Sequence, residues 1–190
     1  MTQDESLQLA IHEEVSLCAY QAEWPAMFEL ERERLLAALP GMLLDVQHFG
    51  STAVPGLAAK PIIDILVGVA SMASADSLLK DLTNAGYSSS AEFNSTLVDR
   101  RWFMRHADGR RTHHLHMVVL GGAEWCRRLR FRDALRADPE LADRYAMLKR
   151  KLALAHAADR ELYTTAKTDF VAAVLLLLEP ACMAPRPYAA

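Results

Sequence analysis

The sequence has few of the residues that mark specialised classes of protein. It contains three cysteines, eight glycines and eight prolines in 190 residues, and only 7% of its residues are aromatic. So little glycine and proline excludes collagen-like and low-complexity chains. The cysteines are widely spaced, odd in number and without a CxxC pair, which excludes a disulfide framework. We therefore expect free thiols in a reducing compartment.

The sequence also lacks a strong excess of charge and a long apolar run. Its 21 basic and 24 acidic residues give a net charge of −3, which makes nucleic acid an unfavoured partner. The longest apolar run, 171–178, is far shorter than the roughly 20 residues of a membrane helix. Acidic residues within 1–15 also differ from the basic start of a signal peptide. These features predict a cytoplasmic protein with no membrane partner.

The composition is typical of a globular domain, since 52% of the residues are hydrophobic. Apolar runs bounded by turn residues predict strands over 43–49, 62–69 and 112–120, with strand or hairpin material over 93–105. Helical spacing and capping residues predict helices over 24–39, 72–85, 123–136, 138–157 and 160–178. This order predicts an α+β fold, in which helices pack on a small mixed β-sheet and the chain ends in a helical segment. We expect one domain over 20–180, with tails at 1–19 and 181–190.

The first candidate site is the turn Gly50-Ser51-Thr52, which follows a predicted strand. Backbone N–H groups in such a turn, together with a serine hydroxyl, suit a phosphate. Asp64 interrupts the next apolar strand, where an unpaired carboxylate is costly and a cation would explain it. Lys60, just before that strand, is placed to reach the same phosphate. A tight turn, a capping aspartate and a solvated lysine are the alternative explanation.

The second candidate site is a histidine pair. His114 and His116 share one face of the predicted strand 112–120, because side chains alternate along a strand, and His113 points to the other face. Two imidazoles and one carboxylate are a suitable ligand set for a single metal ion. Partly buried histidines that bond to their neighbours are the alternative.

A third group of residues is basic. Most of its members are expected on a solvated helix face. Arg132 lies among apolar neighbours, so a fixed salt bridge or a phosphate contact is expected there. The group comprises Arg127, Arg128, Arg130, Arg132, Arg136, Lys149, Arg150, Lys151 and Lys167.

Several long segments resemble the GrpB family of bacterial proteins, across about Tyr20 to Leu178. They are HFGSTAVPGLAAKPIIDILV, THHLHMVV, FRDALRADPELADRYAMLKRKLA and YTTAKTDFV. The family is similar in fold to nucleotidyltransferases, in which a Gly-Ser turn holds phosphates and strand carboxylates bind divalent metal. The resemblance places Gly50-Ser51 at the turn and Asp64 at the first carboxylate. Leu66 stands at the position of the second carboxylate, and His114 and His116 stand where a third is expected.

The resemblance and the residues together support a nucleotidyltransferase-like protein that binds a nucleotide or another phosphorylated small molecule. Asp64, His114 and His116 would hold one divalent metal, either a transition metal or Mg²⁺, and would act in catalysis with Ser51. The phosphate would be bound by Gly50, Ser51, Thr52, Lys60 and Arg132.

Two other hypotheses stay open. Leu66 favours a module that binds a nucleotide or coenzyme A without turnover. The ligand set also fits a 2-His-1-carboxylate iron oxygenase, although the implied fold argues against this function.

Overall fold

The computed structural model describes residues 16–107, 109–156 and 159–178. Its centre is a five-stranded sheet in the order β1-β2-β5-β4-β3. The strands β2 and β5 are parallel, whereas the other neighbouring pairs are antiparallel. This arrangement confirms the predicted small mixed sheet. The strands are β1 (Asp45–Phe49), β2 (Ile63–Val69), β3 (Tyr87–Ser88), β4 (Arg100–Ala107) and β5 (Arg110–Val119).

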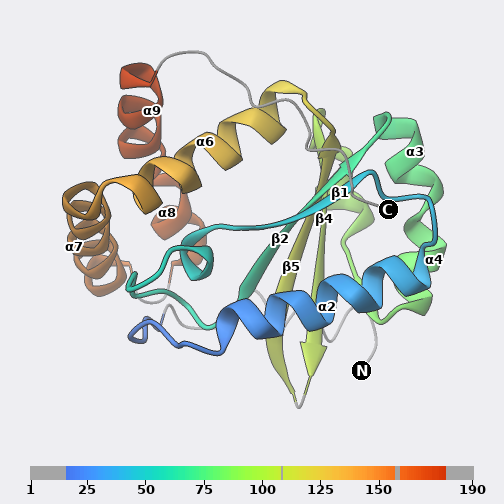
Figure 1. Ribbon diagram of the computed structural model, residues 1–190, viewed down its shortest axis with the longest axis horizontal. Coiled ribbons are helices and arrows are strands. Elements are labelled where there is room, and N and C mark those ends of the chain that lie inside the picture. The colour runs from blue at the N-terminus through green and yellow to red at the C-terminus, as the bar shows by residue number, and fades with distance from the viewer. Residues whose placement is uncertain (1–15, 108, 157–158, 179–190) are drawn as a thin grey trace.

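Helices cover both faces of the sheet, which confirms the α+β class. In Figure 1, α3 and α4 lie on one side of the sheet, while α6 to α9 form a helical group on the other. The helices are α2 (Trp24–Ala38), the 3-10 helix η1 (Ser51–Ala53), α3 (Met72–Ser77), α4 (Leu79–Asn84), α5 (Ala91–Ser95), α6 (Ala123–Ala137), α7 (Pro139–Ala155), α8 (Arg160–Thr165) and α9 (Thr168–Leu177).

The strand β2 is almost wholly apolar because both of its faces are covered. On one face, Ile63, Ile65 and Val67 join the main core beneath α2, α3 and α4. On the other face, Leu66 packs with Trp125 of α6. Asp64 shares this second face, because alternate side chains of a strand point the same way.

Two predicted helices are each divided. The helix expected over 72–85 breaks at Leu78, and the helix expected over 160–178 breaks at Lys167. At both breaks the backbone N–H bonds to the carbonyl three residues back, at 3.2 Å and 3.4 Å. This tighter bond is typical of 3-10 geometry and ends a regular α-helix. The second break places Lys167 between α8 and α9.

Residues 91–95 form the helix α5, where strand or hairpin material was expected. Ser90 begins this helix, since its side chain accepts a bond from the Phe93 N–H. Cys18 has a free thiol, but Cys126 is disulfide-bonded, so the expectation of free thiols is wrong at Cys126.

The predicted tails at the two ends of the chain lie mostly outside the described residues. Residues 1–15 of the predicted N-terminal tail and the whole tail at 181–190 lie outside them. Cys18, which falls within the predicted tail, forms an antiparallel bridge with Ala59. Within the described ranges, none of the helices has the length and apolar character needed to cross a membrane.

Candidate functional site

The pairing of β2 with β5 brings Asp64 and the two histidines together. Asp64 lies opposite His114, and Leu66 lies opposite His116. One possible ligand atom from each of Asp64, His114 and His116 lies within 4.8 Å of the others. The convergence expected from a shared strand face is therefore present, and Leu66 is fully buried against apolar neighbours.

The pair Asp64–His114 has a defined protonation state. Burial raises the pKa of Asp64, but the hydrogen bond from His114 and the nearby positive charges outweigh this effect and lower it overall. Burial lowers the pKa of His114, although Asp64 opposes the shift. At neutral pH the carboxylate is therefore ionised and the imidazole neutral. An ionised carboxylate only accepts, so Nδ1–H of His114 donates to Oδ1 of Asp64 at 3.0 Å.

The second histidine is also neutral. Burial lowers the pKa of His116 well below its usual value, and the charge of Arg128 adds to the effect. Nε2 of His114 and Nδ1 of His116 are buried, and neither has a hydrogen-bond partner among the described residues. Metal binding requires neutral imidazoles and an ionised carboxylate. Asp64, His114 and His116 meet this requirement, and we call them the Asp-His-His cluster.

Gly50 positions the turn that is predicted to bind phosphate beside this cluster. Its φ is +72°, a conformation that favours glycine. A Cβ at this position would lie 2.3 Å from Oδ2 of Asp64, so the backbone approaches the carboxylate more closely than any side chain allows. The turn continues directly into η1, whose first residue is Ser51. The turn at Gly50-Ser51 therefore lies directly against the carboxylate of Asp64.

A buried lysine donates hydrogen bonds to the turn and to the segment that follows it. Lys149 of α7 is 2% exposed, and its Nζ donates to Oγ of Ser51 at 2.9 Å and to the carbonyl of Ala58. Burial, aided by the charge of Lys167, lowers the pKa of Lys149 to about 7. The expectation of a solvated helix face is therefore wrong for Lys149. A signal was available, since Lys149 follows the buried Tyr145 by four residues on one helix face.

Two further lysines lie around Tyr163 of α8. The centre of the Tyr163 ring is 5.2 Å from Nζ of Lys60 and 4.1 Å from Nζ of Lys167. Burial lowers the pKa of Lys167 to about 8, while the charge of Asp64 opposes the shift. Lys60 in turn lowers the pKa of Asp64. Lys60, Lys149 and Lys167, which we call the lysine group, therefore give the surroundings of Asp64 an excess of positive charge.

Arg132 and Thr52, the other expected phosphate ligands, have protein partners. Nε of Arg132 donates to Asp133 at 2.7 Å, and its Nη1 donates to the carbonyl of His48 at 2.8 Å. The fixed salt bridge that the sequence offered as one alternative is thus present. Thr52 is 1% exposed, and its hydroxyl lies 3.0 Å from Nε2 of His48. A phosphate-binding role for Arg132 and Thr52 stays a prediction.

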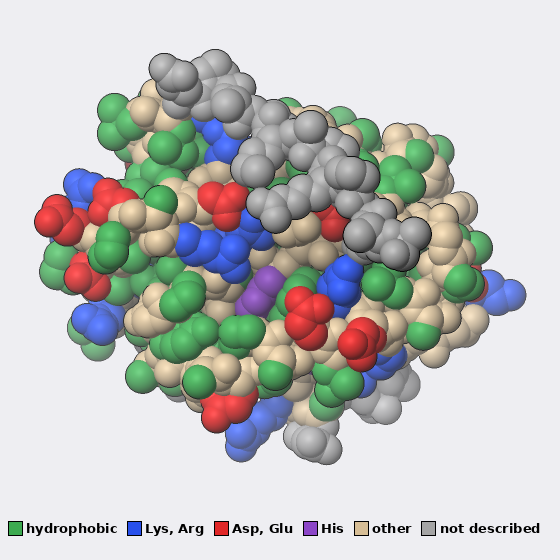
Figure 2. All heavy atoms as spheres, in the orientation of Figure 1, with side chains coloured by type: hydrophobic (Ala, Val, Ile, Leu, Met, Phe, Trp, Pro, Cys, Tyr) green, Lys and Arg blue, Asp and Glu red, His purple; other side chains and the backbone are tan. Residues whose placement is uncertain are grey.

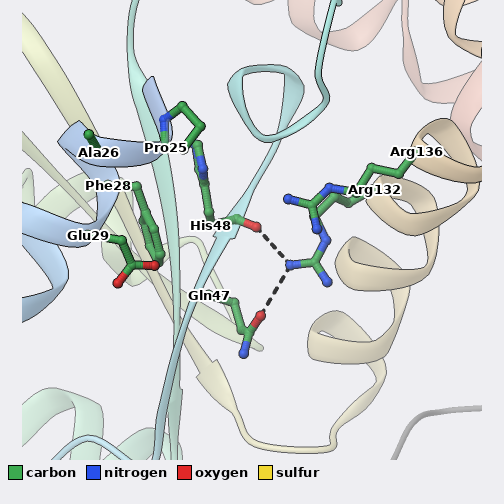
Figure 3. Close-up of a pocket in the computed structure, with 8 residues that line it drawn as sticks. All are labelled: Pro25, Ala26, Phe28, Glu29, Gln47, His48, Arg132 and Arg136. Atoms are coloured by element: carbon green, nitrogen blue, oxygen red, sulfur yellow. Dashed lines mark hydrogen bonds between the residues drawn. The ribbon is translucent and has the colours of Figure 1, made fainter. Parts of the chain in front are cut away.

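A separate cavity of about 380 Å³ opens between α2, β1 and α6. Figure 3 shows His48 between Phe28 and the side chains of Arg132 and Arg136. The rings of Phe28 and His48 stack at 4.8 Å. Figure 2 shows histidine surface in a hollow beside basic side chains on this side of the molecule. Because His48 pairs with Ile65, it points to the sheet face opposite Asp64.

The profile of the family described as GrpB protein matches residues 14–176. The chain belongs to the GrpB family. It is 35% identical to the Glutamate-rich protein GrpB of Alkalihalophilus pseudofirmus, over 85% of this chain and 94% of that protein. It is also 35% identical to YqkA of Bacillus subtilis over 83% of its length, but it spans only 45% of YqkA.

A solved structure of the same family has a similar fold. The structure titled "Crystal structure of conserved protein GrpB from Enterococcus faecalis" superposes with a TM-score of 0.74 at 38% identity, over 84% of this chain and 94% of that one. The family resemblance drawn from the sequence is thus confirmed. The chain has the nucleotidyltransferase-like α+β fold that the resemblance implied.

Proposed function

We propose that the protein binds a nucleotide or another phosphorylated small molecule at a single divalent metal site. We propose further that it transfers a phosphoryl or nucleotidyl group from this ligand to water or to an acceptor hydroxyl, and releases the remainder of the ligand. The observation that carries this proposal is the position of one ionised carboxylate and two neutral imidazoles within 4.8 Å of one another. The lysine group beside them supplies positive charge for an anion. A phosphorylated ligand that also binds the metal satisfies both features.

Each residue has a distinct role in this proposal. Asp64, His114 and His116 hold the metal, which we expect to be a transition metal because imidazole binds Mn²⁺, Fe²⁺ or Zn²⁺ better than Mg²⁺. Ser51 and the lysine group bind the phosphate. The metal would polarise a phosphoryl oxygen of the bound ligand. Gly50 keeps the turn close enough for one ligand to reach both parts of the site.

A module without turnover is the second candidate function. Leu66 takes the position of a second carboxylate and is fully buried, so β2 supplies one acidic ligand rather than two. The phosphate and metal sites would then serve binding alone. Incubation with Mn²⁺ and each nucleoside triphosphate, followed by chromatography, separates the two functions. Conversion that disappears in His116→Ala supports an enzyme, whereas binding without conversion supports a module.

Calorimetric titration with inorganic tripolyphosphate in the presence of Mn²⁺ tests the binding step. We expect the wild type to bind, and Lys149→Met to bind with an affinity loss of about 1.5–3 kcal/mol, the range for a hydrogen bond to a charged group. Lys151→Met is the matched control, because Lys151 lies on the same helix and is exposed. Equal affinities in the two variants would argue against a phosphate site at Lys149.

A further inference from the structure

A pair of aromatic side chains lies on the other side of His114 from Asp64. The strand β4 is the next neighbour of β5, and Trp102 pairs with His116. Its ring centre is 5.5 Å from that of His114. Phe93 of α5 lies edge-to-face with Trp102, with 5.6 Å between the ring centres. The Asp-His-His cluster is therefore flanked by the lysine group on one side and by these two rings on the other.

The two rings are accessible, unlike the other large aromatic side chains near the sheet. Phe93 is 44% exposed, whereas Trp24 and Trp125 are 1% and 2% exposed. Trp102 is half-buried. Neither Phe93 nor Trp102 belongs to the apolar core clusters of the described residues. Packing of the core thus does not account for their position.

The backbone beneath Trp102 is held firmly. Asn94 is 7% exposed, and its side chain donates to the carbonyl of Trp102 at 3.0 Å and accepts from its N–H at 2.7 Å. The strand β3 pairs with β4 only as far as Met104, so Asn94 replaces the missing strand at Trp102. A fixed backbone with a partly exposed ring is suited to stacking on a planar group, since little conformational freedom is lost on binding.

We propose that Trp102 and Phe93 form a stacking subsite for the base of a nucleotide whose phosphates lie at the lysine group. This inference rests on the proposed function and narrows its ligand to a nucleotide. Neighbouring strands lie about 4.8 Å apart, so a ligand that crosses from the Gly50 turn over β2 and β5 reaches β4 after about 14 Å. Stacking on an aromatic ring tolerates every base, because each base has a π-face.

Comparison of two ligands by calorimetry, at saturating Mn²⁺, measures the contribution of the nucleoside, and the Trp102→Leu variant assigns the part due to stacking of the base. Inorganic tripolyphosphate carries the phosphates alone, and ATP adds the ribose and the base. We expect the wild type to bind ATP at least about fivefold more tightly, the lower end of the effect of stacking one base. Trp102→Leu should reduce this preference to nearly one and leave the affinity for tripolyphosphate and for Mn²⁺ unchanged. Phe93→Ser, at an exposed position, should reduce the preference in part.

Tryptophan fluorescence gives a second readout. Trp24 and Trp125 are buried, so quenching by a bound base should act on Trp102. ATP should quench the emission of the wild type more than tripolyphosphate does, and Trp102→Leu should lose this difference.

Different results would contradict the stacking subsite and the proposed function. If the wild type binds tripolyphosphate and ATP equally, or if Trp102→Leu keeps the preference, there is no stacking subsite. Loss of Mn²⁺ and tripolyphosphate affinity in Trp102→Leu would show that Trp102 only positions His114, which also overturns it. If the wild type binds neither ligand with Mn²⁺, the proposed function itself fails.

Discussion

Asp64 and His114 face each other across the parallel strands β2 and β5, with Oδ1 of the carboxylate 3.0 Å from Nδ1 of the imidazole. This pairing explains how an aspartate is accommodated in an otherwise apolar strand, because the charge has a hydrogen-bond donor and lysines nearby. It also sets the tautomer of His114, whose Nε2 then carries a lone pair. A single metal held by both Asp64 and His114 would take the place of this hydrogen bond, because Nε2 points away from the carboxylate.

Substitution of Gly50 tests the close approach of the turn to Asp64. Gly50→Ala places a Cβ 2.3 Å from Oδ2 of Asp64, at a φ of +72°. Gly56→Ala is the comparison for a positive φ without a close contact, because Gly56 has a φ of +78° and nothing within 4 Å of its Cβ position. Gly50 has a ψ of −169°, a conformation that is essentially restricted to glycine, so its loss combines backbone strain with the contact. Gly56→Ala should lose about 1–2 kcal/mol of stability for the left-handed backbone alone, and Gly50→Ala should lose more. Urea denaturation measures both, and equal losses would contradict the contact.

Proton uptake tests the role of the lysine group in anion binding. Burial lowers the pKa of Lys149 to about 7 and that of Lys167 to about 8, so both are partly neutral at pH 8. A bound anion favours their charged forms and raises both pKa values. Tripolyphosphate binding at pH 8 should therefore take up about one proton.

Calorimetry in buffers with different ionisation enthalpies measures this proton uptake. Lys149→Met should reduce the dependence of the binding enthalpy on the buffer, and Lys151→Met should leave it unchanged. A wild-type enthalpy that is the same in every buffer would show that neither lysine titrates on binding.

The cluster could be predicted from the sequence only in part. Strand alternation placed His114 and His116 on one face, and an aspartate within an apolar strand indicated a special environment for Asp64. The alignment of Asp64 with His114 depends on the pairing of β2 with β5, which are separated by about 50 residues of chain. The local pattern of neither strand specifies that pairing.

The lysine group was harder to predict for a different reason. Lysines are mostly solvated, so the residue type favoured exposure of Lys149. Its burial depends on the packing of α7 against the turn at Ser51, 98 residues earlier in the chain. Lys167 reaches the site because the predicted helix over 160–178 breaks beside it. No glycine or proline marks this break in the sequence.

Acid should destabilise the protein through His48. Burial lowers its pKa from 6.5 to about 4, so the folded state keeps this imidazole neutral while the unfolded state takes up a proton below pH 6.5. The free energy of unfolding therefore falls as the pH decreases, by about 1.5 kcal/mol between pH 6.5 and pH 5 from this group alone. Urea denaturation at several pH values measures the effect.

The variant His48→Gln isolates this contribution, because other histidines also titrate. Burial likewise lowers the pKa of His113 to about 4, so the variant should keep some dependence on pH. We expect its stability to fall less steeply than that of the wild type below pH 6.5. Parallel curves for the two proteins would show that His48 does not titrate as its burial requires.

We propose that Asp64, His114 and His116 bind one divalent metal, and the effect of a chelator on thermal stability tests this proposal. A bound metal stabilises the folded state by mass action, by about 2.7 kcal/mol at a concentration 100 times the Kd. In the presence of Mn²⁺, EDTA should lower the Tm of the wild type and leave the Tm of the double variant Asp64→Ala, His114→Ala unchanged. An equal response of both proteins to EDTA would contradict the metal site.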